Sequence, residues 1–174
     1  MSNNIDDELF IIAIDQTEKL ILNSLEFERS ANFGKVRRGH DEGKVGIHVR
    51  QIINYIEDNY KFDSDYTSLR LIALLHDIGK YEGNNEYHSI TSEKIARKFI
   101  QDEEILRLIL IHDRPYGYWK NFKKEGKIDT KSFIDLFSSV NWKLLIKFRY
   151  SDDCNRSQEA SKWFEKICNE LIND

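Results

Sequence analysis

Apolar residues recur along this chain at spacings of three and four, the period of an amphipathic helix. Strand-like alternation of apolar and polar residues is absent. The pattern predicts six helices and a last helical stretch through Trp163 and Leu171, with the six near residues 7–29, 45–60, 66–78, 88–100, 103–113 and 131–150. We therefore expect an all-α protein, a compact single-domain bundle of about six to seven helices.

One predicted helix, near residues 66–78, differs from the others. Its stretch 71–75 is apolar on every side, which is typical of a central, buried helix. Gly79 is the residue type expected just past a helix C-terminus. Pro115 and Gly117 are expected to end the helix that precedes them, near residues 103–113.

Composition and charge narrow the class of protein. Of 174 residues, 40% are hydrophobic and 32% charged, which fits one globular domain. The net charge of −4 argues against general nucleic-acid binding, which needs a basic face. No apolar run approaches the roughly 20 residues of a membrane-spanning helix. Residues 1–7 lack the features of a signal peptide, so we expect a cytoplasmic protein without a membrane partner.

A basic stretch stands out against this acidic balance. Residues 114–131 hold six lysines and arginines against two acidic residues. The stretch is either a solvated loop or a rim that attracts an anionic substrate. A second basic loop, residues 33–43, contains His40, for which a surface role is the default and a substrate contact the alternative.

Protonatable side chains interrupt the apolar sides of five expected helices, each near a helix end. They are His48, His76, His88, His112 and Asp152. A single inward histidine is usually a hydrogen-bonded core residue. Burying five such groups without partners would be costly, and one shared cation would remove that cost. The mixture of imidazole and carboxylate therefore predicts a metal site, and these ligands suit Mn, Fe, Co, Ni, Mg or Zn.

The doublet His76-Asp77 is the centre of this hypothesis. Neighbouring helical residues point about 100° apart, but at a helix end both side chains can reach one ion. Lys80 follows closely, and its ammonium suits a phosphate oxygen beside the metal. The alternative for Lys80 is a solvated lysine that complements the helix dipole.

The segment Leu74-Leu75-His76-Asp77-Ile78-Gly79-Lys80 resembles the HD superfamily of metal-dependent phosphohydrolases. That family's pattern is a histidine, a His-Asp doublet and a distant aspartate, and His48 and Asp152 stand at the flanking positions. The resemblance covers about residues 45–156. It suggests a single HD domain over residues 1–174, in which residues 1–40 are an added N-terminal helix and basic loop.

The resemblance implies that His48, His76, Asp77 and Asp152 hold one divalent ion. His88 and His112 stand where members with a second metal carry two further histidines. The expected reaction is hydrolysis of a phosphate ester, with a nucleotide favoured, by a metal-activated water. In a site with one ion, His88 and His112 would instead contact phosphate or move a proton.

Three features leave alternatives open. Asp153, beside Asp152, is a second candidate for the last ligand. Some two-metal members have paired histidines where this chain reads His112-Asp113. The run His112-Asp113-Arg114-Pro115 also resembles HD domains attached to tRNA nucleotidyltransferases, so the alternative function is a module that binds a nucleotide or an RNA end without turnover.

The remaining candidates concern the substrate. Catalytic candidates are Asp77, Lys80, His88 and His112, and substrate-binding candidates are Lys80, Arg114 and Tyr116. Lys80 and Arg114 would stabilise charge at the phosphoryl group. We expect five aromatic residues mainly to cover the core: Tyr116, Tyr118, Trp119, Trp142 and Trp163. Tyr116 and Tyr118 are the best candidates for an exception.

Overall fold

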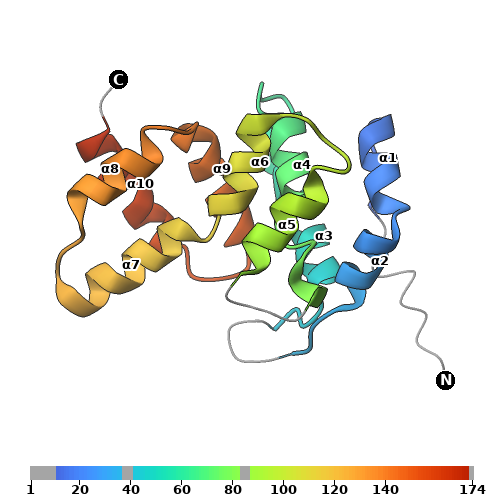
Figure 1. Ribbon diagram of the computed structural model, residues 1–174, viewed down its shortest axis with the longest axis horizontal. Helices are drawn as coiled ribbons and strands as arrows, with labels where there is room; N and C mark the ends of the chain where they lie inside the picture. The colour runs from blue at the N-terminus through green and yellow to red at the C-terminus, as the bar shows by residue number, and fades with distance from the viewer. Residues whose placement is uncertain (1–10, 37–40, 83–86, 173–174) are drawn as a thin grey trace.

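The computed structural model describes residues 11–36, 41–82 and 87–172, and every regular element in these ranges is helical (Figure 1). The all-α expectation is confirmed. The count of six to seven helices is wrong, because ten α-helices and one short 3-10 helix occur in the described ranges. They are α1 (Gln16–Leu22), α2 (Leu25–Asn32), α3 (Val45–Tyr60), α4 (Tyr66–Leu75), η2 (Lys80–Glu82), α5 (His88–Ala96), α6 (Glu103–Ile111), α7 (Arg114–Glu125), α8 (Thr130–Phe137), α9 (Trp142–Asp152) and α10 (Glu159–Leu171).

Capping side chains inside the apolar runs explain most of the extra helices. The helix expected near residues 7–29 is divided into α1 and α2, because Ser24 Oγ accepts a bond from Phe27 N at 3.1 Å and starts a new helix. Likewise, Asn141 Oδ1 accepts from Leu144 N at 3.0 Å and starts α9, dividing the helix expected near residues 131–150. Periodicity alone does not detect such breaks.

The basic stretch 114–131 is largely helical rather than a loop. Pro115 lies in the first turn of α7, where its missing N–H costs nothing, so it begins a helix instead of ending one. Gly117 lies within the same helix. Gly126, in the left-handed conformation at φ 69°, ends it.

The helices are arranged in an elongated bundle (Figure 1). Helices α1 and α2 lie at one end, α7, α8 and α10 at the other, and α3, α4, α5, α6 and α9 between them. Helix α4 is central, as expected: residues 69–75 are all buried, and the helix packs against α3, α6 and α9. Helix α4 therefore lies in the interior of the bundle.

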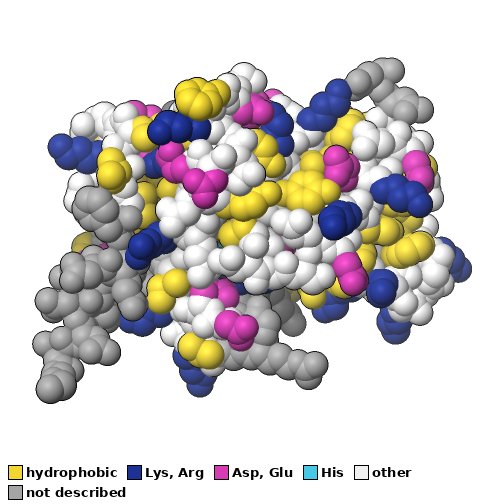
Figure 2. Space-filling model, turned by 180° about the vertical axis from the view of Figure 1, so that it is seen from behind, with side chains coloured by type: hydrophobic (Ala, Val, Ile, Leu, Met, Phe, Trp, Pro, Cys, Tyr) yellow, Lys and Arg dark blue, Asp and Glu magenta, His cyan; other side chains and the backbone are white. Residues whose placement is uncertain are grey.

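At the end of the bundle formed by α7, α8 and α10, α7 packs on α10, and phenylalanines of α8 and α10 form an aromatic core. Seen from behind, the surface mixes lysine and arginine with acidic side chains and shows no histidine among the described residues (Figure 2). No helix in the described ranges is long and apolar enough to cross a membrane.

Candidate metal centre

Six side chains proposed from the sequence as metal or catalytic groups converge in the middle of the bundle. They come from five places in the chain and are all buried: His48 on α3, His76 and Asp77 in the turn after α4, His88 at the start of α5, His112 directly after α6, and Asp152 at the end of α9. They form two groups of three, and within each group the potential ligand atoms lie within 4.8 Å of one another.

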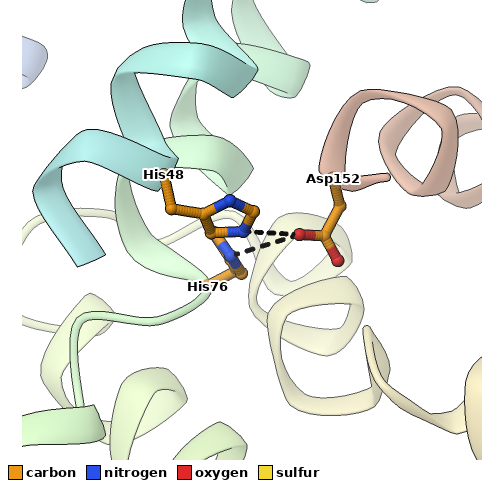
Figure 3. A group of neighbouring side chains, drawn as sticks. All are labelled: His48, His76 and Asp152. Carbon is orange, nitrogen blue, oxygen red and sulfur yellow. Dashed lines mark hydrogen bonds and ion pairs between the residues drawn. The ribbon is translucent and has the colours of Figure 1, made fainter. Parts of the chain in front are cut away.

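The first group, which we call triad A, consists of His48, His76 and Asp152 (Figure 3). Asp152 Oδ1 lies 2.8 Å from His48 Nε2 and 3.9 Å from His76 Nε2. Ligand atoms about 2.0–2.2 Å from one ion lie at most about 4.4 Å apart. Both distances are therefore compatible with a shared ion.

The second group, triad B, consists of Asp77, His88 and His112. Asp77 Oδ1 lies 3.3 Å from His88 Nε2 and 3.8 Å from His112 Nε2, and the two imidazole nitrogens lie 3.4 Å apart. The other carboxylate oxygen, Asp77 Oδ2, lies 3.3 Å from His76 Nε2 of triad A. Asp77 thus stands between the triads, with one oxygen toward each.

Backbone hydrogen bonds orient two of the imidazoles. The Nδ1 of His76 donates to the carbonyl of Ala73 at 2.9 Å, and the Nδ1 of His112 donates to the carbonyl of Ile109 at 2.7 Å. A carbonyl can only accept, so Nδ1 carries the proton and Nε2 keeps a lone pair in the neutral ring. This arrangement is usual in histidines that bind metals.

Two atoms at the boundary of the triads have no hydrogen-bond partner although they are buried: His76 Nε2 and Asp77 Oδ1. Leaving a buried polar atom unsatisfied costs about 1–3 kcal/mol, and more where the group is charged. A cation between these lone pairs would satisfy both. The residues present therefore fit a divalent metal ion.

The turn that carries the doublet is held against α5 by Gly79. A Cβ at this position would lie 2.5 Å from the backbone nitrogen of Ser92, so only glycine allows the close approach. The N–H of Gly79 also donates to Ser92 Oγ at 2.9 Å. Helix α4 ends at Leu75 rather than near Ile78, so His76 and Asp77 lie just after the helix, close to the start of α5.

The structure distinguishes Asp152 from Asp153. Arg149, buried on α9, donates from Nη1 to Asp152 Oδ2 and from Nη2 to both oxygens of Asp153 at 3.0 Å. Asp153 also accepts from Ser161 Oγ of α10 at 2.6 Å. Asp152 therefore keeps Oδ1 toward the histidines, whereas Asp153 is held on the side of α10. The sequence analysis missed Arg149, although its place four residues after Leu145 on the buried side of a helix was a usable signal.

Electrostatics separate the same two aspartates. Burial alone would raise the pKa of Asp152, but Arg149 and His48 hold it well below its usual value. Burial raises the pKa of Asp153 despite the contact with Arg149. The pKa of His112 is lowered by burial, which favours the neutral imidazole that a metal requires. Of the two aspartates, Asp152 is thus the one whose surroundings favour the anionic form.

Lys80 is bound to the centre. Its Nζ donates to Asp77 Oδ2 at 2.5 Å. Burial would raise the pKa of Asp77, but His76 and Lys80 hold it well below its usual value. Burial alone would lower the pKa of Lys80, but the negative charge of Asp77 outweighs this effect and raises the pKa. Both groups are therefore charged.

Both triads open into one cavity of about 950 Å³. Lys80 and Tyr116 line this cavity, and so do several residues that were not connected with the site from the sequence, among them Gln51, Trp119 and Arg156. Arg114 is exposed at the start of α7 and is not among the lining residues. His40 lies outside the described residues.

A family model described as HD domain matches residues 45–135, more than half of the chain. The chain belongs to the HD domain family. Asp152 lies beyond the matched range. The other five side chains of the two triads lie inside it: His48, His76, Asp77, His88 and His112. The extent of the domain, 1–174, stays a prediction. Neither a curated protein nor a solved structure matches the chain.

Proposed function

We propose that this HD domain protein is a divalent-metal-dependent phosphohydrolase that cleaves a phosphate ester, with nucleotides as the favoured substrates. The observation that carries the proposal is the pair of buried triads that line one cavity, in which His76 Nε2 and Asp77 Oδ1 have no hydrogen-bond partner. Buried polar atoms are normally hydrogen-bonded, and a cation between these two atoms would satisfy both.

The metal would be held by His48, His76 and Asp152, with Asp77 beside them, and a second ion by Asp77, His88 and His112. A divalent ion bound there lowers the pKa of a water molecule and polarises a phosphoryl oxygen. Mixed imidazole and carboxylate ligands suit several first-row metals and Mg²⁺, so Mn²⁺ and Co²⁺ are reasonable first choices for an assay.

Residues of the chain itself would bind and orient the substrate. Lys80 places its ammonium at the edge of the centre, where it would contact a phosphate oxygen and stabilise charge that develops in the transition state. His88 Nε2 lies 3.1 Å from Asp113 Oδ2 at the cavity wall, so with one ion bound His88 would hold a proton for the leaving oxygen. The cavity lies in the size range of small-molecule sites, about 300–1,000 Å³.

The test is a panel of phosphate esters assayed with Mn²⁺ or Co²⁺. We expect turnover of at least one nucleotide, and a loss on the order of a thousandfold in kcat/KM for Asp77→Asn. The matched control is Asp135→Asn, since Asp135 is an exposed carboxylate on α8 away from the cavity. Circular dichroism checks that both variants fold.

The outcomes distinguish the functions. Nucleotide or RNA-end binding without turnover under any metal would support the alternative of a binding module. Elemental analysis that finds no metal, together with a melting temperature unchanged by chelation, would remove both metal-dependent functions.

A further inference from the structure

Two aromatic side chains of α7 face the cavity instead of the core. Tyr116 and Trp119 both line the cavity; their ring centroids lie 5.5 Å apart with an interplanar angle of 32°. Tyr116 is 44% exposed, whereas Phe133 and Phe137 are completely buried. We call these two side chains the Tyr116–Trp119 pair.

The other side of α7 shows what a core aromatic residue looks like in this region. Tyr118 lies edge-on to Phe133 and Phe137, at centroid distances of 5.2 and 5.8 Å, and packs against the hydrophobic core. Tyr118 therefore anchors α7 and covers the core, which was the default expectation for all these aromatic residues. Trp119 departs from that expectation because it lines the cavity.

The Tyr116–Trp119 pair belongs to the same cavity as the metal centre. Tyr116 follows His112 of triad B by only four residues, because α7 begins directly after the His112-Asp113 turn. Between the two rings in sequence, Gly117 also lines the cavity, and a Cβ at this position would meet no atom within 4 Å other than those of its chain neighbours and its own helix backbone. The cavity is thus open beside the rings.

Polar side chains line other parts of the cavity wall. Gln51 lies one turn beyond His48 on α3, and Asn155 and Ser157 lie in the segment between α9 and α10. Amides and hydroxyls both donate and accept hydrogen bonds, as the edges of nucleobases do. The cavity wall therefore combines the ionisable groups of the triads, aromatic side chains on α7 and neutral polar groups elsewhere.

We propose that the Tyr116–Trp119 pair stacks on the nucleobase of the substrate while its phosphate lies at the triads. The proposal rests on the phosphohydrolase function and names its substrate class, a nucleotide. Every nucleobase has an aromatic face, so stacking of this kind tolerates different bases but distinguishes nucleotides from sugar phosphates. The ammonium of Lys120, 5.6 Å from the Tyr116 ring centroid, lies over this ring and supplies positive charge beside it.

The first experiment measures binding without turnover. Adenosine, guanosine, cytidine and uridine are titrated into the full chain by calorimetry, with ribose as the ligand that lacks a base. We expect nucleosides but not ribose to bind, and Trp119→Leu to weaken nucleoside binding by about tenfold or more. Trp119→Phe restores an aromatic face and is expected to recover most of the affinity. Phe62→Ala, at a side chain that is 98% exposed and outside the cavity, is the control and should change nothing.

The second experiment uses the metal-loaded enzyme with adenosine monophosphate and ribose 5-phosphate. We expect Tyr116→Ala and Trp119→Leu to raise KM for the nucleotide by about tenfold more than KM for ribose 5-phosphate, which lacks a base. Nucleosides that do not bind the wild-type protein, or that bind Trp119→Leu as tightly as wild type, overturn the stacking proposal whether or not the protein hydrolyses anything. Nucleoside binding that depends on Trp119 in a protein without turnover would leave the stacking site standing and remove the hydrolase function.

Discussion

Two clusters of charged side chains involve α4 and the turn that follows it, and they differ in how completely their buried polar atoms are hydrogen-bonded. In the first, Arg70 of α4 donates from Nε and Nη2 to the two oxygens of Glu18 at 2.8 Å, from Nη2 to the Ile12 carbonyl at 2.8 Å, and from Nη1 to Glu57. Glu18 also accepts from Ile14 N at 3.1 Å. Every nitrogen of the guanidinium that can donate does so.

The second cluster is the metal centre, whose His76 and Asp77 directly follow the C-terminus of the same helix. It is equally buried, but His76 Nε2 and Asp77 Oδ1 have no hydrogen-bond partner and the cluster lines a cavity. In this protein, the burial of charged side chains therefore does not by itself identify a ligand-binding site. A closed, satisfied network indicates structure, and unpaired atoms beside open space indicate a place for a ligand.

The largest effect on stability is expected from breaking the closed network. Glu18→Ala removes two acceptors and leaves Arg70 buried without its main partner, which should lower the free energy of unfolding by about 3–5 kcal/mol. Urea denaturation measures this loss. The control, Lys98→Met, breaks the exposed pair between Lys98 and Glu26 and should cost about 0–1 kcal/mol. Equal, small losses in both variants would show that the Arg70 network is not structural.

Added metal should stabilise the folded protein only by binding to the second cluster, the metal centre. At a concentration of Mn²⁺ one hundred times its Kd, binding to the folded state alone adds about 2.7 kcal/mol to the free energy of unfolding. We expect this gain, measured with and without chelator, in the wild type and in Glu18→Ala. Asp77→Asn should lose it, because Asp77 stands between the two triads. A gain that persists in Asp77→Asn would place the metal elsewhere.

The difference between the clusters also explains what the sequence could predict. The histidines and Asp152 interrupt apolar stripes near helix ends, so local periodicity indicated them and the structure brings them together. Arg70 interrupts the apolar run of α4 in the same way, but its partner Glu18 lies 52 residues away in α1. Nothing local links the two, so neither was singled out.

The cavity wall shows the second limit of the sequence. Residues 114–131 were expected as a loop or a basic rim, and helix α7 turns Tyr116 and Trp119 to the cavity and Tyr118 to the core. Which face of α7 is buried depends on its packing against α10, a contact between segments about 40 residues apart. The number of helices failed for a different reason, since the capping bonds of Ser24 and Asn141 fall inside runs with a helical pattern.

Gly79→Ala tests how firmly the turn after α4, which carries His76 and Asp77 of the metal centre, is fixed. The added Cβ would lie 2.5 Å from Ser92 N and 2.8 Å from a backbone carbon of Thr91, and backbone cannot move aside cheaply. We expect a loss of about 1–3 kcal/mol in the free energy of unfolding, the usual cost of overpacking. Because the same shift would move His76 and Asp77, the Mn²⁺ stabilisation should weaken as well. An unchanged urea midpoint with full Mn²⁺ stabilisation would show that this turn tolerates displacement.

Gly117→Ala makes the same substitution where the structure leaves space, and it should have the smallest effect and the opposite sign. Gly117 lies within α7, and a Cβ there meets no atom within 4 Å. Alanine restricts the unfolded chain and favours the helix, so the free energy of unfolding should rise by about 0.5–1 kcal/mol. Thermal melting measures the gain, and nucleoside binding should be unchanged because one methyl group fills little of the cavity. A destabilised Gly117→Ala would mean that α7 lies closer to the opposite wall, and the open space beside the Tyr116–Trp119 pair would then be too narrow for a base.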